Sequence, residues 1–310
     1  MAGLKGFEAA TGTTLAVRYG GLFWIPVSET TPWLPAPVRL ALHRPPPAAR
    51  AGPFAWRAAG PGLEIGEMPV LAGAIEADRI ELVRIDPARY RFVVRNDPTG
   101  RRGLDAWRAD LGAAVVINGS YYGRDGRPAT PVVIDGRPAG PSDYQARQGA
   151  FVASRGGARL VDLSDQDWRR ALSGAEAAMV SYPLLLAADG SSRAPPGTGW
   201  LANRSFVAED RQGRIVLGST RGAFFSLDRL AAFLRASPLD LKLALDLDGG
   251  PVACQAVDVG PVHRRTCGAW ELQVDKAGHA KVLPPSWPGH QPSMPMVLAV
   301  YPRTAAAGAD

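Results

Sequence analysis

The chain has 310 residues, of which 46% are hydrophobic and 21% are charged, and these proportions exclude a mainly disordered protein. It contains no uninterrupted run of about 18 apolar residues, so we expect no membrane-spanning helix. The net charge of +6 is concentrated at the N-terminus: residues 1–60 carry six basic and two acidic side chains, whereas residues 61–310 carry 29 basic and 27 acidic ones. The near balance of the longer part predicts no binding to nucleic acid.

Residues 1–60 differ in composition from the remainder of the chain. They hold eight of the 28 prolines, and these prolines interrupt every short apolar run. The segment therefore lacks the apolar core of a secretory signal peptide, although Ala49-Arg50-Ala51 has the small-x-small form of a leader cleavage site. We expect residues 1–60 to be a leader-like segment or a proline-rich extension, and residues 61–310 to form one main domain.

The first predicted elements of that domain are two strands and a helix. Residues 79–86 and 90–95 alternate apolar and polar side chains, which predicts two half-buried strands in a hairpin. Residues 101–112 carry apolar side chains at helical spacing and end in glycine, which predicts an amphipathic helix. The apolar run 113–117 then predicts a buried strand that ends in the polar segment 118–122.

Strands predominate in the remainder of the chain as well. A serine three residues before an aspartate predicts a capped helix over 164–172, and residues 226–236 show the clearest helical periodicity. This pattern favours an α+β fold with a mixed, mostly antiparallel sheet, a few packed helices and a single main domain. The other segments predicted as strands or apolar strand-like runs are 131–134, 150–153, 179–187, 205–209, 214–219, 243–248, 270–274 and 296–301.

The end of the 243–248 run carries the most informative acidic side chains. In a strand, Asp246 and Asp248 lie on the same face with Cα atoms about 6.6 Å apart. Two such carboxylates repel each other, so one of them keeps its proton near neutral pH, and the pair can divide acid and base roles. Gly249 and Gly250 permit a sharp turn and a close approach of backbone to a ligand. The alternative is a plain turn in which Asp246 bonds to neighbouring backbone.

Two other segments carry candidate ligand-binding side chains. Asn118, Gly119 and Ser120 follow a buried strand, where ligands of sheets often bind, and Tyr121 can stack on a sugar ring. Arg204 precedes a predicted strand and can bind two oxygens of a phosphate group. The alternatives are a polar turn at 118–120 and a solvated surface arginine.

Several kinds of chemistry are disfavoured by the sequence. None of the four histidines lies in these segments, so Ser–His and Cys–His nucleophilic schemes have no base and a metal site has too few ligands. No phosphate-binding loop and no dinucleotide-binding glycine fingerprint is present. We therefore expect carboxylate chemistry with no cofactor and no metal. Cys254 and Cys267 either form a disulfide, which would indicate an oxidising compartment, or stay as two thiols.

The order of these segments resembles that of the phosphodiester glycosidase family, which includes the uncovering enzyme of the lysosomal pathway, and more closely its bacterial branch. The resemblance covers roughly residues 75–302. It rests on an Asn-Gly strand end, a Pro-Leu-Leu segment before Asp-Gly, an Asn-Arg-Ser segment before two strands, a capped helix and an Asp-Gly-Gly segment. In this chain these are Asn118-Gly119, Pro183-Leu184-Leu185, Asn203-Arg204-Ser205, the helix that begins at Ser226, and Asp248-Gly249-Gly250.

The resemblance implies cleavage of a sugar-1-phosphodiester at its glycosidic bond. It implies that Arg204 holds the phosphate and that Asp248 or Asp246 acts as acid/base or stabilises the oxocarbenium-like state. The substrate would be a carbohydrate or glycosyl phosphate, and the implied location is periplasmic or secreted, which agrees with a Cys254–Cys267 disulfide.

The chain departs from the family pattern after Gly250. Pro251 follows where the family has a further glycine and a serine, and proline removes a backbone donor that could contact phosphate. The alternative function is therefore a non-catalytic glycan-binding or envelope scaffold protein on the same fold.

Overall fold

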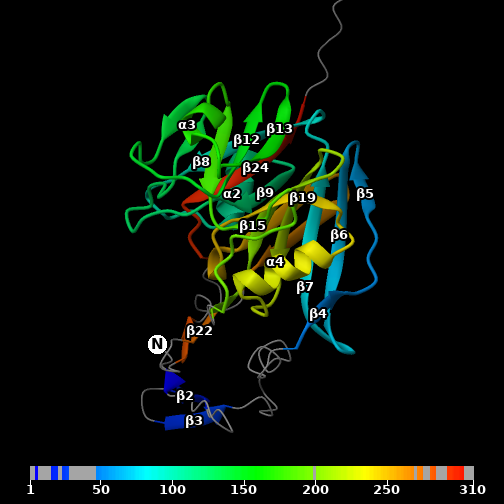
Figure 1. The fold of residues 1–310 in the computed structure, drawn as a ribbon, viewed down its shortest axis with the longest axis vertical. Helices are drawn as coiled ribbons and strands as arrows, with labels where there is room; N and C mark the ends of the chain where they lie inside the picture. Colours follow the sequence, from blue (N-terminus) through cyan, green and yellow to red (C-terminus); the bar gives the residue numbers. More distant parts are fainter. Residues whose placement is uncertain are drawn as a thin grey trace, which may run out of the picture.

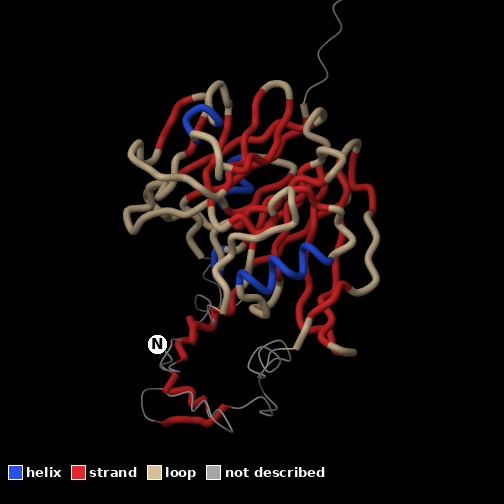
Figure 2. Tube along the Cα trace, in the orientation of Figure 1, coloured by secondary structure: helices blue, strands red, loops and turns tan. Residues whose placement is uncertain are grey.

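The computed structural model describes residues 47–197, 200–268 and 292–303 in full. It also gives the backbone of five strands outside these ranges: β1 (Leu4–Lys5), β2 (Leu15–Tyr19), β3 (Phe23–Val27), β22 (Glu271–Val274) and β23 (Ala280–Leu283). Strands predominate over helices in the part of the chain that is described (Figure 2). All of the described strand pairs are antiparallel, so the parallel component that a mixed sheet requires is not found among them.

The largest sheet has eight strands and forms one wall of the molecule (Figure 1). Seven of its strands follow one another and the eighth, β5, pairs with β6. In spatial order they are β15 (Leu184–Leu186), β19 (Leu241–Asp246), β17 (Ser205–Asp210), β18 (Ile215–Thr220), β7 (Ile75–Ile85), β6 (Leu63–Ala72) and β4 (Ala49–Ala51), with β5 spanning Arg57–Gly60.

Two five-stranded sheets complete the main body, and two three-stranded sheets, β16-β22-β23 and β1-β2-β3, are smaller. The first five-stranded sheet has the order β21 (Val262–Cys267), β20 (Cys254–Val259), β9 (Val115–Asn118), β24 (Met296–Pro302) and β8 (Tyr90–Asn96). The second has the order β11 (Arg137–Ala139), β10 (Val132–Ile134), β14 (Ala177–Ser181), β12 (Gly149–Ser154) and β13 (Gly157–Asp162), and β16 spans Trp200–Ala202.

The central core lies between the eight-stranded sheet and the two five-stranded sheets. Alternate residues of each strand supply it, as the period of two in a strand requires. In β19, Leu243 and Leu245 enter this core together with Leu247, whereas Ala244 packs on the opposite face of the sheet. The leucine side chains of the 243–247 run therefore face one side of the sheet and Ala244 the other.

Three α-helices cover outer faces of the sheets. Helix α4 (Leu227–Ala236) packs across the eight-stranded sheet, as Figure 1 shows. Helix α2 (Leu104–Leu111) buries Leu104 and Trp107 against the sheet that contains β9, and it ends at Gly112 in the left-handed conformation. The third helix, α3 (Trp168–Ala171), is shorter than predicted because Asp167, and not Ser164, accepts the capping hydrogen bond.

The predicted hairpin of residues 79–86 and 90–95 is not formed, because β7 pairs with β6 and β18 whereas β8 pairs with β24 in another sheet. The predicted apolar segment 179–187 is divided between β14 and β15, with Tyr182 and Pro183 between them. The predicted boundary near residue 61 falls between β5 and β6, which pair with each other, and the Ala49-Arg50-Ala51 run is β4, which pairs with the far end of β6. The eight-stranded sheet thus includes strands from both sides of that boundary.

Gly218 of β18 offers a test of the packing in this sheet. A Cβ at Gly218 would lie 2.2 Å from Cζ of Phe206, whose ring is fully buried and covers it. We expect Gly218→Ala to lower the free energy of unfolding by about 1–3 kcal/mol through overpacking. Urea denaturation of the purified variant measures the effect, with Gly156→Ala, where a Cβ meets only an atom at 3.9 Å, as the control. Equal stability of the two variants would contradict this packing.

Candidate active site

Asn118, the last residue of β9, connects this strand with the distant turn at Asp248 and with the start of β20 that follows the turn. Its Nδ2 donates to the carbonyl of Asp248 at 2.6 Å, and its Oδ1 accepts from the backbone N–H of Cys254 at 3.2 Å. The backbone N–H of Asp248 in turn donates to the carbonyl of Gly119 at 3.1 Å. The predicted polar strand end and the predicted acidic segment therefore meet.

The glycine turn after Asp248 packs against the start of β17. Gly250 has φ +70°, a conformation that favours glycine, and its N–H donates to the carbonyl of Asn203 at 2.8 Å. A Cβ at Gly249 would lie 3.0 Å from the Asn203 carbonyl oxygen and 3.3 Å from Nη1 of Arg204. The absence of a side chain at Gly249 thus leaves room beside the Arg204 guanidinium. Pro251 lies in a short 3-10 turn (Gly250–Val252) and fits its first positions.

Arg204 is buried, with 6% of its surface exposed, and is held by neutral groups. Its Nη2 donates to the carbonyl of Trp200 at 2.9 Å and its Nε donates to the carbonyl of Phe225 at 3.3 Å. No carboxylate among the described residues forms an ion pair with it, in contrast to arginines such as Arg214 and Arg108. A buried guanidinium without an ion pair can bind an anionic ligand.

Asp246 is fully buried at the end of β19. Its Oδ2 accepts from the Tyr121 hydroxyl at 3.0 Å, and its Oδ1 has no hydrogen-bond partner among the described residues. Burial raises the pKa of Asp246 to about 8, with a smaller contribution from Asp248, while Arg204 and the Tyr121 hydrogen bond act in the opposite direction. Asp246 therefore holds a proton at neutral pH, and burial rather than repulsion by Asp248 is the main reason.

Asp248 is the half-buried member of the acidic pair. Its backbone is fixed by hydrogen bonds with Asn118 and Gly119. Burial is the larger cause, and the negative charge of the Asp248 carboxylate a further cause, of the raised pKa values of two tyrosines, Tyr121 and Tyr182. Because Asp246 is inaccessible, Asp248 is the carboxylate of the pair that a ligand can reach.

Tyr182 belongs to the same cluster, and the sequence did not predict it. Its ring stacks on that of Tyr121 with 4.3 Å between the centroids and an interplanar angle of 22°, and it is 40% exposed. The available signal was an aromatic residue followed by Pro183 in the middle of an apolar segment, since proline after an aromatic side chain indicates a break between two strands.

Ser120 and Gly119 have local roles in this geometry. The Ser120 hydroxyl is buried and donates to the carbonyl of Val180 at 2.7 Å, which ties the end of β9 to β14. Gly119 lies against Met296, since a Cβ there would be 2.7 Å from the Met296 Cγ. Both residues therefore fix the position of the strand end.

The disulfide between Cys254 and Cys267 begins four residues after Gly250, at the end of the glycine turn. The two cysteines are directly paired on β20 and β21, and Cys254 also contacts Asn118 through its backbone. Gly268, which follows, donates its N–H to the carbonyl of Ala253 at 2.8 Å. The disulfide thus links the two strands at the point where the turn after Asp248 enters β20.

At the N-terminus of α4, the Ser226 hydroxyl is bonded to the carboxylate of Asp228. Ser226 takes the N-cap position of α4, but its hydroxyl donates to Asp228 and accepts no helix N–H. Asp228 also accepts from the Gly197 N–H at 3.1 Å.

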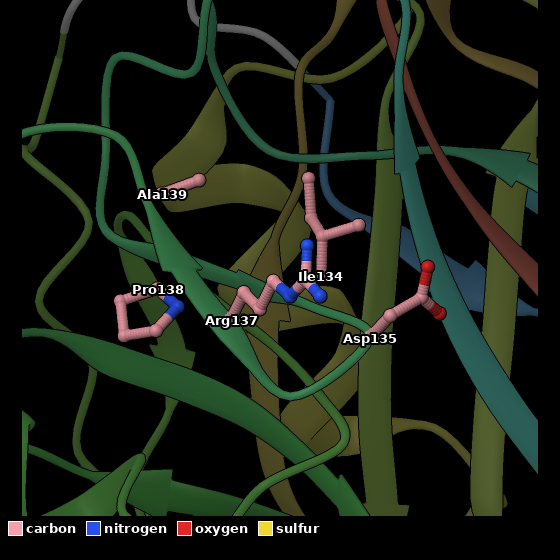
Figure 3. Close-up of a pocket in the computed structure, with 5 residues that line it drawn as sticks. All are labelled: Ile134, Asp135, Arg137, Pro138 and Ala139. Atoms are coloured by element: carbon pink, nitrogen blue, oxygen red, sulfur yellow. The ribbon is translucent and has the colours of Figure 1, made fainter.

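A surface pocket lies apart from this cluster, on the hairpin of β10 and β11. Figure 3 shows its lining, which includes Asp135 and Arg137. The Asp135 carboxylate accepts from Arg95 at 2.9 Å, and none of the predicted site residues line the pocket.

Within residues 47–197, 200–268 and 292–303, no group of three or more His, Cys, Asp or Glu side chains is placed to hold a metal ion. No helix in the described part of the chain is long and apolar enough to cross a membrane.

The protonation of Asp246 predicts a pH-dependent stability. Its pKa is about 8 in the folded protein against 3.8 for an ordinary aspartate, so the unfolded chain loses this proton first as the pH rises. The free energy of unfolding then falls by up to about 1.4 kcal/mol per pH unit between pH values of about 4 and 8, and the loss is complete above the folded pKa. Asp246→Asn, which does not titrate, should show a shallower fall.

Thermal unfolding of the wild type and Asp246→Asn at a series of pH values measures this difference. Asp143→Asn, at an exposed loop position, is the matched control and should follow the wild type. Parallel pH profiles for the wild type and Asp246→Asn would show that Asp246 is ionised in the folded protein.

Comparison with known proteins identifies a family for this chain. The family model of the phosphodiester glycosidases matches residues 111–274, which include Asn118, Arg204, Asp246 and Asp248. No curated protein matches the chain.

Two solved structures are similar to the chain at low sequence identity. One is the zebrafish N-acetylglucosamine-1-phosphodiester alpha-N-acetylglucosaminidase catalytic domain, auto-inhibited by its pro-peptide, with 14% identity, a TM-score of 0.53, and coverage of 83% of this chain and 89% of that one. The other is a hypothetical protein from Synechocystis, with 16% identity, a TM-score of 0.47, and coverage of 82% and 64%. The fold is thus shared with the zebrafish domain, and because the family match spans more than half of the chain, the protein belongs to the phosphodiester glycosidase family.

Proposed function

We propose that the protein is a hydrolase that cleaves a glycosyl phosphodiester at its glycosidic bond. The observation that carries this proposal is the meeting of an amide, a guanidinium and an accessible carboxylate from three distant segments. Asn118 bonds to the backbone of Asp248, and the glycine that follows Asp248 lies against Arg204. These are the groups that a sugar-1-phosphodiester requires: a cation for the phosphate and a carboxylate at the anomeric carbon.

Arg204 is proposed to bind the phosphate. Its Nε and Nη2 are engaged by the carbonyls of Phe225 and Trp200, which fix the plane of the guanidinium. The space at Gly249 lies beside Nη1. A phosphate oxygen placed there would form a charge-assisted hydrogen bond in a buried environment, where such a bond is stronger than in water.

Asp248 is proposed to act at the anomeric carbon. The C1–O bond breaks as water attacks C1, the water gives a proton to the Asp248 carboxylate, and the phosphate monoester leaves with the bonding electron pair. A phosphate monoester has a second pKa of about 6 and is a weak base, so its departure requires little help from an acid. One accessible carboxylate therefore suffices, and this agrees with a pair in which Asp246 is fully buried.

Asp246 is proposed to be a positioning residue that holds Tyr121 in place and does not touch the substrate. Its protonated carboxyl group bonds to the Tyr121 hydroxyl, and it adds no negative charge next to Asp248 at neutral pH. A second carboxylate at that place would compete with the phosphate for Arg204.

The family and the disulfide support a proposed substrate class and location. The zebrafish relative is named for an N-acetylglucosamine-1-phosphodiester, so the proposed substrate class is a sugar-1-phosphodiester, in the cell envelope. The Cys254–Cys267 disulfide supports a periplasmic or secreted location, because disulfides persist in oxidising compartments.

One observation favours a second candidate function, a glycan-binding or envelope scaffold protein without activity. The N–H of Gly250 is bonded to Asn203, and Pro251 has no N–H, so neither amide of this turn offers a donor to phosphate. Binding of a glycosyl phosphodiester without turnover, and with equal affinity in Asp248→Asn, would favour this function.

Turnover of the methyl phosphodiester of α-N-acetylglucosamine 1-phosphate tests the proposed activity. We expect Asp248→Asn to lower kcat by about 100-fold or more, because the base is lost. We expect Arg204→Ala to lower kcat/KM by about 10- to 100-fold through loss of a charge-assisted bond, and Arg204→Lys, which keeps the charge, to lower it less.

Asp135→Asn and Arg155→Ala are the matched controls, because Asp135 lies at the separate pocket and Arg155 is 92% exposed. Wild-type protein that releases no more sugar than Asp248→Asn and Arg204→Ala would refute the enzyme proposal.

A further inference from the structure

An exposed aromatic side chain, Tyr182, lies beside the proposed site. Three large hydrophobic residues are exposed among those that the structure describes: Ile75 at 50%, Tyr182 at 40% and Trp200 at 39%. Ile75 begins β7, whereas Tyr182 stacks on Tyr121 and the carbonyl of Trp200 accepts from Arg204. Single exposed hydrophobic residues are ordinary, but the exposed Tyr182 ring is stacked on a tyrosine that belongs to the polar cluster, and this indicates a binding surface.

Tyr182 is held rigidly by contacts on both sides of it. The Ser181 hydroxyl donates to the carbonyl of Asp246 at 2.6 Å, and the carbonyl of Pro183 accepts from the Asp246 N–H at 3.1 Å. One face of the Tyr182 ring is covered by Tyr121, whose hydroxyl is bonded to the Asp246 carboxyl group. A side chain fixed in this way loses little conformational entropy when a ligand binds.

The Tyr182 side chain is coupled electrostatically to Asp248 and to another tyrosine. Burial, and then the Asp248 carboxylate, raise the pKa of Tyr182. Burial, and then Tyr182, raise the pKa of Tyr144. Tyr144 belongs to a loop that the indole N–H of Trp168 anchors by donating to the Tyr144 carbonyl at 2.8 Å. The stacking of Tyr182 on Tyr121, whose hydroxyl bonds to Asp246, places its ring beside the same polar cluster.

We infer that the ring of Tyr182 is the binding platform for the sugar of the substrate, an inference that rests on the proposed function. With the phosphate at Arg204 and the anomeric carbon at Asp248, the pyranose ring extends over Tyr182. The C–H groups on one face of a pyranose stack on an aromatic ring. The hydroxyl groups at the edge of the sugar ring can then point towards Tyr144. Because Tyr121 covers the other face, Tyr182 accepts one ring, and it selects substrates whose sugar presents an apolar face there.

Steady-state kinetics and calorimetry with the methyl phosphodiester of α-N-acetylglucosamine 1-phosphate test the inference. We expect Tyr182→Ala to raise KM by about tenfold while kcat changes by less than about threefold, since the contact binds the sugar but takes no part in the chemistry. Tyr182→Phe keeps the ring and should recover most of the affinity. Binding measured in an Asp248→Asn background, with and without Tyr182→Ala, separates affinity from turnover.

Tyr301→Ala is the matched control, because this half-buried tyrosine lies on β24 beyond the residues that pair with β9. Thermal unfolding confirms that each variant is folded.

If the wild type is active and Tyr182→Ala has wild-type KM and affinity, the sugar platform is refuted while the proposed activity stands. If the wild type binds without turnover and Tyr182→Ala abolishes binding, the activity is refuted and the platform stands. Absence of both binding and turnover in the wild type refutes both.

Discussion

The hydrogen bond from the Asn118 amide to the Asp248 carbonyl joins the parts of the chain from which the site is built. Asn118 ends a strand of one sheet, and Asp248 follows β19, a strand of another, so this bond spans the boundary between them. The Oδ1 atom of the same amide holds the start of β20 next to the disulfide. An asparagine suits this position because its side chain donates and accepts at once, and an aspartate there would have no donor for the Asp248 carbonyl.

The two acidic residues differ because the strand ends between them. Asp246 is the last residue of β19 and is covered on all sides, while Asp248 lies in the turn and is half-buried. Burial keeps a proton on Asp246, which leaves Arg204 without a fully charged neighbour at that position. The same residue fixes Tyr121 and both residues that flank Tyr182. The proposed sugar contact therefore depends on Asp246 through its carboxyl group at Tyr121 and through its backbone at Ser181 and Pro183.

Sequence reasoning reached the strands with clear alternation, because alternation is a local pattern, and it named Asn118 and the two aspartates as site candidates from their places at strand ends and from family order. It did not reach β6, because Gly66 and Pro69 lie inside that strand and such residues weaken a strand pattern. It also missed the boundary between β14 and β15, because a continuous apolar run does not show where a strand ends. It treated Asp246 and Asp248 as equivalent, since spacing places both on one face but does not tell which one the neighbouring strands bury. Tyr182 was missed for the same reason: its role depends on contacts with residues far away in sequence.

A crystal structure of Asp248→Asn with the methyl phosphodiester of α-N-acetylglucosamine 1-phosphate tests the central claim most directly. The account predicts a phosphate oxygen within hydrogen-bonding distance of the Arg204 guanidinium, the anomeric carbon next to residue 248, and the sugar ring on Tyr182. A ligand bound elsewhere, or bound here with its phosphate turned away from Arg204, would contradict it.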